Sequence, residues 1–113
     1  MILFAIIFTL VLLLALYLFP IIEVIGDSML PTYKEGKLLL SVRVFFKSQL
    51  KVNDIYTFIS PQGKLVIKRL KHISKEGCFF EGDNKEVSYD SRKYGYIKFN
   101  KIKTHIIGGK SYE

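Results

Sequence analysis

The feature that most constrains this chain is an uncharged hydrophobic run at its start, from Ile2 to Phe19. These 18 residues include only Thr9 and Tyr17 as polar groups, and they approach the length that an α-helix needs to cross the hydrocarbon core of a bilayer. Pro20 ends the predicted helix, and Glu23 marks the return to polar sequence. A basic leading region and a small-x-small cleavage site are both missing, which favours an uncleaved single-pass membrane anchor over a removable signal peptide.

The anchor divides the 113 residues into a membrane segment, 1–20, and one compact domain, 21–113. The formal net charge of +7 lies mostly in the second part, which predicts attraction to anionic lipid headgroups and so a bilayer as a partner. Basic residues after the span favour a cytoplasmic domain, but a long folded domain can cross a membrane largely regardless of its charge. No motif of a nucleic-acid-binding fold accompanies the charge, so no nucleic-acid partner is predicted.

Beyond the anchor, patterns of period two replace the helical run and predict a mainly β domain, a small antiparallel sheet or barrel. No amphipathic helical period is convincing there. Cys78 is the only cysteine, so the chain can form no internal disulfide, and neither a metal site nor a cofactor is predicted. The predicted strands lie within residues 36–46, 54–60, 64–74, 78–81 and 96–107.

The strand at residues 64–74 carries a lysine whose setting suggests chemistry. Side chains alternate along a strand, so Lys68 shares one face with Val66, Leu70 and His72. If that face is the core, burial lowers the pKa of the lysine and allows it to act as a general base. On its own, the pattern around this residue favours a solvated strand lysine over a buried base.

Four short motifs follow one another along the domain: "GDSMLPT", "VIKRL", "GDN" and "SYDSRKYG". Together they resemble the bacterial type I signal peptidases, the Ser-Lys proteases that remove signal peptides from exported preproteins. The matching positions are Gly26, Ser28, Met29, Pro31 and Thr32, then Lys68 and Arg69, then Gly82, Asp83 and Asn84, and last Ser88, Asp90, Ser91, Arg92 and Gly95. Only 13 residues separate Lys68 from Gly82, so the large second domain of the better-known enzymes is absent.

The resemblance implies that Ser28 is the nucleophile and that neutral Lys68 is its general base. A serine hydroxyl is a weak nucleophile until a neighbouring base takes its proton. By the same resemblance, the Ser88 hydroxyl hydrogen-bonds and orients Lys68. Gly26 stands where some relatives have a serine that helps the oxyanion hole, which leaves the backbone N–H of Ser28 to supply most of that stabilisation.

The remaining motif residues are expected to be structural. Asp90 and Arg92 are predicted to form an ion pair, and Asp83 to fix a turn or pair with Arg92. His72 and His105 occur without matching motifs, although His72 shares the nominal face of Lys68 and stays a minor candidate.

The family's mode of binding implies that an extended signal peptide lies as a strand between residues 22–27 and 64–68. Val24, Ile25 and Val66 are candidates for lining pockets for small side chains, and Met29 for packing at an apolar rim. The expected location is the cell membrane, with the catalytic domain on the extracytoplasmic side, where the anchor raises the effective concentration of membrane-bound substrate.

Three other readings stay open at this point. The chain could be a self-cleaving Ser-Lys regulatory protein, since such proteins share the first two motifs. It could be a binding protein that keeps the fold without turnover. It could also be a specialised maturation peptidase for a single exported or conjugation-related peptide, which its small size allows.

Overall fold

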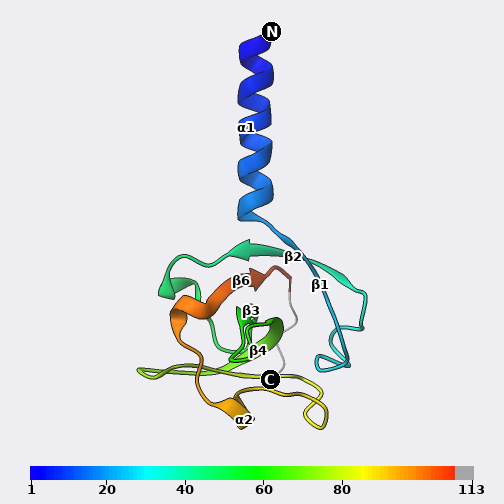
Figure 1. Ribbon diagram of the computed structural model, residues 1–113, viewed down its shortest axis with the longest axis vertical. Coiled ribbons are helices and arrows are strands. Elements are labelled where there is room, and N and C mark those ends of the chain that lie inside the picture. The colour runs from blue at the N-terminus through cyan, green and yellow to red at the C-terminus, as the bar shows by residue number, and fades with distance from the viewer. Residues whose placement is uncertain (109–113) are drawn as a thin grey trace.

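An N-terminal helix and a six-stranded antiparallel sheet make up the computed structural model, which describes residues 1–108 (Figure 1). The mainly β fold is therefore confirmed. Helix α1 spans Ile2–Leu18, and three short helical turns lie at η1 (Lys47–Gln49), α2 (Ser91–Tyr94) and η2 (Phe99–Lys101). The strands are β1 (Ile21–Glu23), β2 (Leu38–Arg43), β3 (Ile55–Ile59), β4 (Leu65–Ser74), β5 (Gly77–Glu81) and β6 (Ile102–Ile106).

Helix α1 projects away from the β domain, and none of its residues is buried (Figure 1). The prediction that the run from Ile2 to Phe19 crosses a membrane is wrong. Pro20 disfavours helical geometry at the residue before it, and the helix ends at Leu18 after 17 residues. At about 1.5 Å per residue this gives roughly 25 Å, against a hydrocarbon core of about 30 Å. No helix within residues 1–108 has the combination of length and apolar character that a membrane crossing needs.

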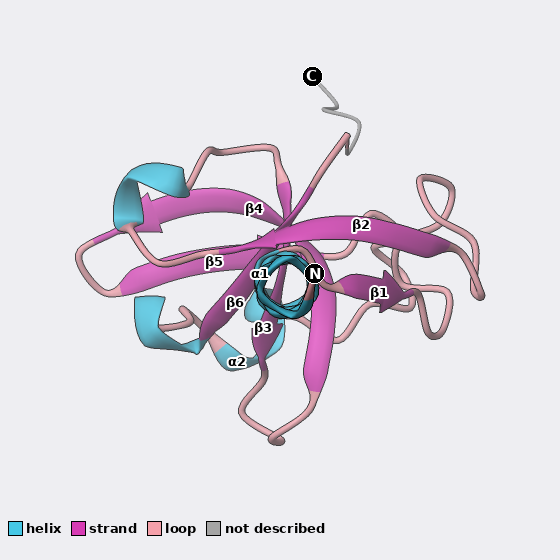
Figure 2. Ribbon diagram, turned by 90° about the horizontal axis from the view of Figure 1, so that it is seen from above, coloured by secondary structure: helices cyan, strands magenta, loops and turns pink. Residues whose placement is uncertain are grey.

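The sheet is ordered β1-β2-β6-β3-β4-β5, and every neighbouring pair is antiparallel. Seen from above, β2 passes beneath the base of α1 and the other strands fan out below it (Figure 2). Arg43 at the end of β2 joins the two parts, because its Nε donates to the Tyr17 carbonyl at 2.6 Å and its guanidinium lies 4.2 Å from the centre of the Tyr17 ring. The division at residue 20 stays a prediction.

Two hydrophobic clusters pack on opposite faces of the central strands. Ile55 on β3 belongs to one cluster, and the next residue, Tyr56, belongs to the other. Because successive side chains of a strand point to opposite faces, β3 and the middle of β4 are buried on both sides. Because both sides of β4 are buried there, its sequence around Lys68 does not alternate simply between apolar and polar residues.

Most predicted strands are present, with shifted ends. The strand expected at residues 96–107 begins only at Ile102, because the turn η2 occupies Phe99–Lys101. Four elements were not predicted, namely the three-residue β1 and the short turns η1, α2 and η2. Helix α2 begins after Asp90, whose carboxylate accepts a hydrogen bond from the Arg92 N–H and caps the turn.

Candidate active site

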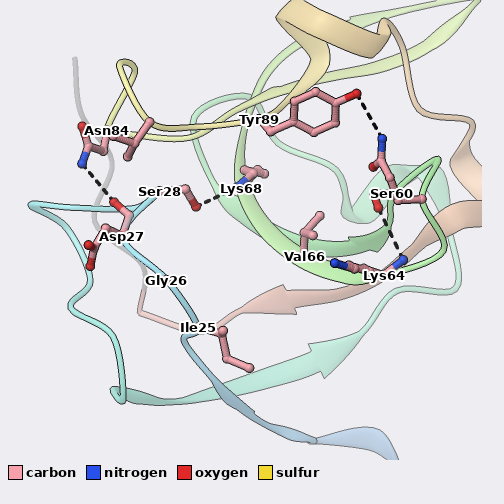
Figure 3. Close-up of a pocket in the computed structure, with 12 residues that line it drawn as sticks. Ile25, Gly26, Asp27, Ser28, Ser60, Lys64, Val66, Lys68, Asn84 and Tyr89 are labelled. Carbon is pink, nitrogen blue, oxygen red and sulfur yellow. Dashed lines mark hydrogen bonds between the residues drawn. The ribbon is translucent and has the colours of Figure 1, made fainter.

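Ser28 and Lys68 meet across 40 residues of sequence, with Lys68 Nζ 2.6 Å from Ser28 Oγ (Figure 3). Lys68 is presented by β4, whose pairing with β3 places it opposite Tyr56. Ser28 lies in the turn after β1, where Gly26 adopts a φ of 81° that side-chain-bearing residues rarely take. The nucleophile and base named by the sequence motifs are therefore in direct contact.

The setting of Lys68 supports a role as a base. Its side chain is only 6% exposed, and burial lowers the pKa of the amine because the charged form loses hydration. The nearby negative charge of Asp90 works against this shift and raises the pKa in part. A lowered pKa increases the fraction of neutral amine that can take the Ser28 proton.

Ser88 lies close to this dyad but makes other contacts than predicted. Its hydroxyl donates to Asp90 Oδ2 at 2.6 Å and accepts from the Gly82 N–H at 3.1 Å, rather than hydrogen-bonding Lys68. The Asp90 carboxylate is a stronger hydrogen-bond acceptor for this hydroxyl than the neutral Lys68 amine, because the carboxylate is ionised. Burial acts to raise the pKa of its carboxyl, but hydrogen bonds from Arg92, Ser88 and the Gly82 N–H lower that pKa to about 2.

Asp90 and Arg92 form an ion pair, with Arg92 Nε 3.0 Å from Asp90 Oδ1. Asp83 does not pair with Arg92 as one alternative expected. Its carboxylate instead accepts two bonds of 2.8 Å from Arg69, the residue after the base on β4, and one from the Thr32 hydroxyl. No sequence pattern connects Arg69 with this loop, because the two partners are 14 positions apart in the chain.

A cleft runs past the dyad between the segment after β1 and the first half of β4. It consists of two adjoining hollows of about 660 and 500 Å³, which share Ile25, Ser28, Lys64, Val66 and Lys68 in their walls. The peptide-binding segments predicted from the resemblance, residues 22–27 and 64–68, therefore lie along this cleft. Figure 3 shows Ile25 and Val66 on its two sides.

Two of the predicted pocket residues lie elsewhere. Val24 is 1% exposed and Met29 is fully buried, and both belong to the hydrophobic cluster beneath the nucleophile turn. The reason is the alternation of the chain around the turn, which points Ile25 outward and its predecessor inward. Val24 and Met29 therefore support the turn from below and do not face a bound peptide.

Residues outside the predicted set also hold or line the site. The Gly26 N–H donates to Glu35 Oε2 at 2.9 Å, and Asn84 binds the nucleophile turn through both its backbone and its carboxamide. Tyr89 and Gln62 close one end of the larger hollow, with a hydrogen bond of 3.1 Å between them. Asn84 belongs to a recognised motif, but Glu35 and Gln62 carry no sequence signal.

Neither histidine is part of the dyad. His105 Nε2 lies 3.0 Å from Asp54 Oδ2, and the His105 ring stacks on Tyr56. The His72 ring packs edge-on against Tyr96. Within the described residues, neither ring hydrogen-bonds Ser28.

A serine hydroxyl in contact with a buried lysine, at the edge of a cleft in a small antiparallel β domain, defines a serine peptidase of the Ser-Lys type. Residues 18–110 match the Peptidase S24-like family, and the chain belongs to that family. It is a hydrolase of the serine protease class. No curated protein matches the chain.

Proposed function

We propose that this peptidase is a signal-peptidase-type endopeptidase that cleaves signal peptides from exported preproteins. The observation that carries the proposal is the contact of 2.6 Å between Lys68 Nζ and Ser28 Oγ at the side of an open cleft. The four motifs in the order typical of type I signal peptidases favour this substrate class within the family.

The reaction uses the dyad twice. Neutral Lys68 takes the proton of Ser28 as Oγ attacks the scissile carbonyl carbon, and the resulting ammonium then protonates the leaving amine. An acyl ester on Ser28 remains. Lys68, neutral again, takes a proton from a water molecule that attacks the ester, and the acid product leaves as Ser28 recovers its proton.

The shape of the cleft supports binding of an extended peptide. Its walls are β1 with the segment that follows it, residues 21–28, and the start of β4, residues 64–68, and the smaller hollow is lined mainly by aliphatic side chains. Main-chain hydrogen bonds from such walls would bind many sequences, while shallow hollows would admit small apolar side chains at alternate positions. This combination fits the cleavage of signal peptides, which differ in sequence but need small residues at alternate positions before the cleaved bond.

The test is cleavage of a purified preprotein by the full chain in detergent. Ser28→Ala and Lys68→Ala should both abolish cleavage, and Lys68→Arg should not restore it because a guanidinium keeps its proton. Ser48→Ala and Lys101→Ala replace the same residue types at exposed positions and should leave the rate unchanged. Normal cleavage by Ser28→Ala would refute the proposal.

The same assay separates the alternatives. A self-cleaving regulatory protein would shorten its own chain and leave the preprotein intact, which mass spectrometry of both proteins would show. A specialised maturation peptidase would cleave one exported peptide and not a general preprotein. A binding protein would cleave neither.

We propose further that the peptidase works at the extracytoplasmic surface of a cell membrane, with the bilayer as a partner that α1 contacts without crossing. The apolar and exposed side chains of α1 support this, together with the net charge of +7. In flotation with anionic phospholipid vesicles, the full chain should rise with the lipid, and a variant lacking residues 2–18 should not. Equal flotation of both would contradict this role of the helix.

A further inference from the structure

Asn84 makes two contacts with the main chain on the two sides of the nucleophile. Its backbone N–H donates to the Ser28 carbonyl at 2.8 Å, and its carboxamide Nδ2 donates to the Asp27 carbonyl at 3.1 Å. Figure 3 shows Asn84 beyond Asp27 and Lys68 beyond Ser28, on the other side of the turn. The loop that follows β5 therefore holds the nucleophile turn from the side away from the base.

The contact with Asp27 has a consequence for the next N–H. A peptide unit is planar and trans, so the carbonyl of Asp27 and the N–H of Ser28 belong to one rigid group and point in opposite directions. A donor that fixes the carbonyl on one side therefore aims the N–H away from Asn84. Among the described residues, the Ser28 N–H donates to no protein acceptor, so it is free to bind an oxyanion.

We propose that Asn84 is a positioning residue for the oxyanion hole, acting through the Asp27–Ser28 peptide unit. The inference rests on the proposed peptidase function. Hydrogen-bond donors aimed at the developing oxyanion stabilise the transition state because they need no reorganisation during the reaction. The carboxamide of Asn84 supplies that fixed aim, and its role is separate from the proton transfer by Lys68.

Two neighbouring contacts support the same interpretation. Gly82 packs so closely on the turn that a Cβ there would lie 2.6 Å from the Ser28 carbonyl oxygen, so the loop that carries Asn84 is in direct contact with the nucleophile's backbone. The Asp27 carbonyl also accepts the Leu30 N–H at 3.2 Å within the turn. Loss of the Asn84 carboxamide therefore removes one of two constraints on the peptide unit.

The test compares Asn84→Ala and the isosteric Asn84→Asp with Lys85→Ala. Lys85 is the adjacent residue, with an exposed side chain whose ammonium is 3.4 Å from Glu81, and its variant is the matched control. Complete loss of an oxyanion-hole donor typically costs about 100- to 1000-fold in kcat, so misalignment of a retained donor should cost about tenfold. In Asn84→Ala, KM should stay unchanged, and so should the pH at which activity rises, because that substitution adds no charge beside Lys68.

A second readout follows the tetrahedral state directly. A peptide boronic acid with alanine next to boron forms a tetrahedral adduct with Ser28, so both Asn84 variants should bind it about tenfold more weakly. This measurement needs no preprotein cleavage, so it tests Asn84 even if another peptide proves to be the substrate. Thermal unfolding shows which variants are folded, and Asn84→Asp serves as the test if Asn84→Ala is not.

Three results would overturn the proposal. Unchanged kcat and boronate affinity in a folded variant would show that Leu30 alone fixes the peptide unit. A raised KM with unchanged kcat would place Asn84 in substrate binding, and a shifted pH profile of the uncharged Asn84→Ala variant would show that Asn84 acts through Lys68. Failure of the proposed function is a different result, namely cleavage that survives Ser28→Ala.

Discussion

The buried pair of Arg69 and Asp83 offers the sharpest test of how the site is held together. The Arg69 side chain is 0% exposed and that of Asp83 is 10% exposed. Two parallel bonds of 2.8 Å join the guanidinium to the carboxylate, and Arg69 also donates to the Asn53 carbonyl. Because Asp83 accepts the Thr32 hydroxyl as well, the pair connects β4, the loop after β5 and the segment after the nucleophile.

Asp83→Asn preserves the size of the side chain but removes the negative charge that the two Arg69 hydrogen bonds meet. Removal of one partner of a buried ion pair typically destabilises a protein by about 3–5 kcal/mol. Because domains of this size are stable by about 5–15 kcal/mol, the variant should lose about a fifth or more of its free energy of unfolding. The loss should appear as a lower midpoint in urea, measured by circular dichroism, with an unchanged slope.

The double variant Arg69→Met with Asp83→Leu separates the charge effect from the packing. Replacement of a whole buried pair by apolar residues of similar volume is often neutral, so the double variant should be more stable than Asp83→Asn. The reasoning is refuted if Asp83→Asn costs less than about 1 kcal/mol, the value of a surface pair. It is also refuted if the double variant is as unstable as the single one.

Other predictions concern the base and the packing around the nucleophile. Because burial lowers the pKa of Lys68 and only its neutral form accepts a proton, kcat/KM should rise with pH through that pKa; a flat profile between mildly acidic and alkaline pH would contradict this. Asp90→Asn removes the charge that raises the pKa of Lys68, so the rise should move to lower pH, and a move to higher pH would contradict the assignment. Gly82→Ala would force its Cβ against Ser88 and the nucleophile turn, and kcat should fall on the order of tenfold or more, which a kinetic assay of the folded variant would check. Met29→Ala should lower the free energy of unfolding by about 2–5 kcal/mol in a urea titration, because the side chain is fully buried; a loss below that range would mean that the cavity collapses.

The sequence predicted the β domain well because its strands are short, rich in β-branched and aromatic residues and separated by turn residues. It did not predict β1, which has only three residues, or α2, whose only local signal is the capping Asp90. The length of the first helix was overestimated because the hydrophobic run continues through Phe19, while the effect of Pro20 on the residue before it stops the helix at Leu18.

The dyad was predicted from the motifs, but its surroundings were not. The contact between Asn84 and Asp27 spans 57 residues, and no local periodicity reports a contact of that kind. The prediction that Ser88 hydrogen-bonds Lys68 did not consider Asp90. This charged acceptor is only two residues away and takes the hydrogen bond of the Ser88 hydroxyl. Val24 and Met29 were misplaced for a related reason, since the direction of each side chain depends on how the turn sits over the hydrophobic cluster.

The register of the β3–β4 hairpin decides which side chain faces Ser28. Lys68 and Arg69 are consecutive, and they leave β4 on opposite faces, one toward Ser28 and the other toward Asp83. A slip of one residue in the strand pairing would exchange those faces and present to the hydroxyl a cation that never gives up its proton. The short turn at residues 60–64 connects the two strands at that pairing. A single-residue insertion in this turn that shifts the register should therefore abolish activity, as the loss of Ser28 would.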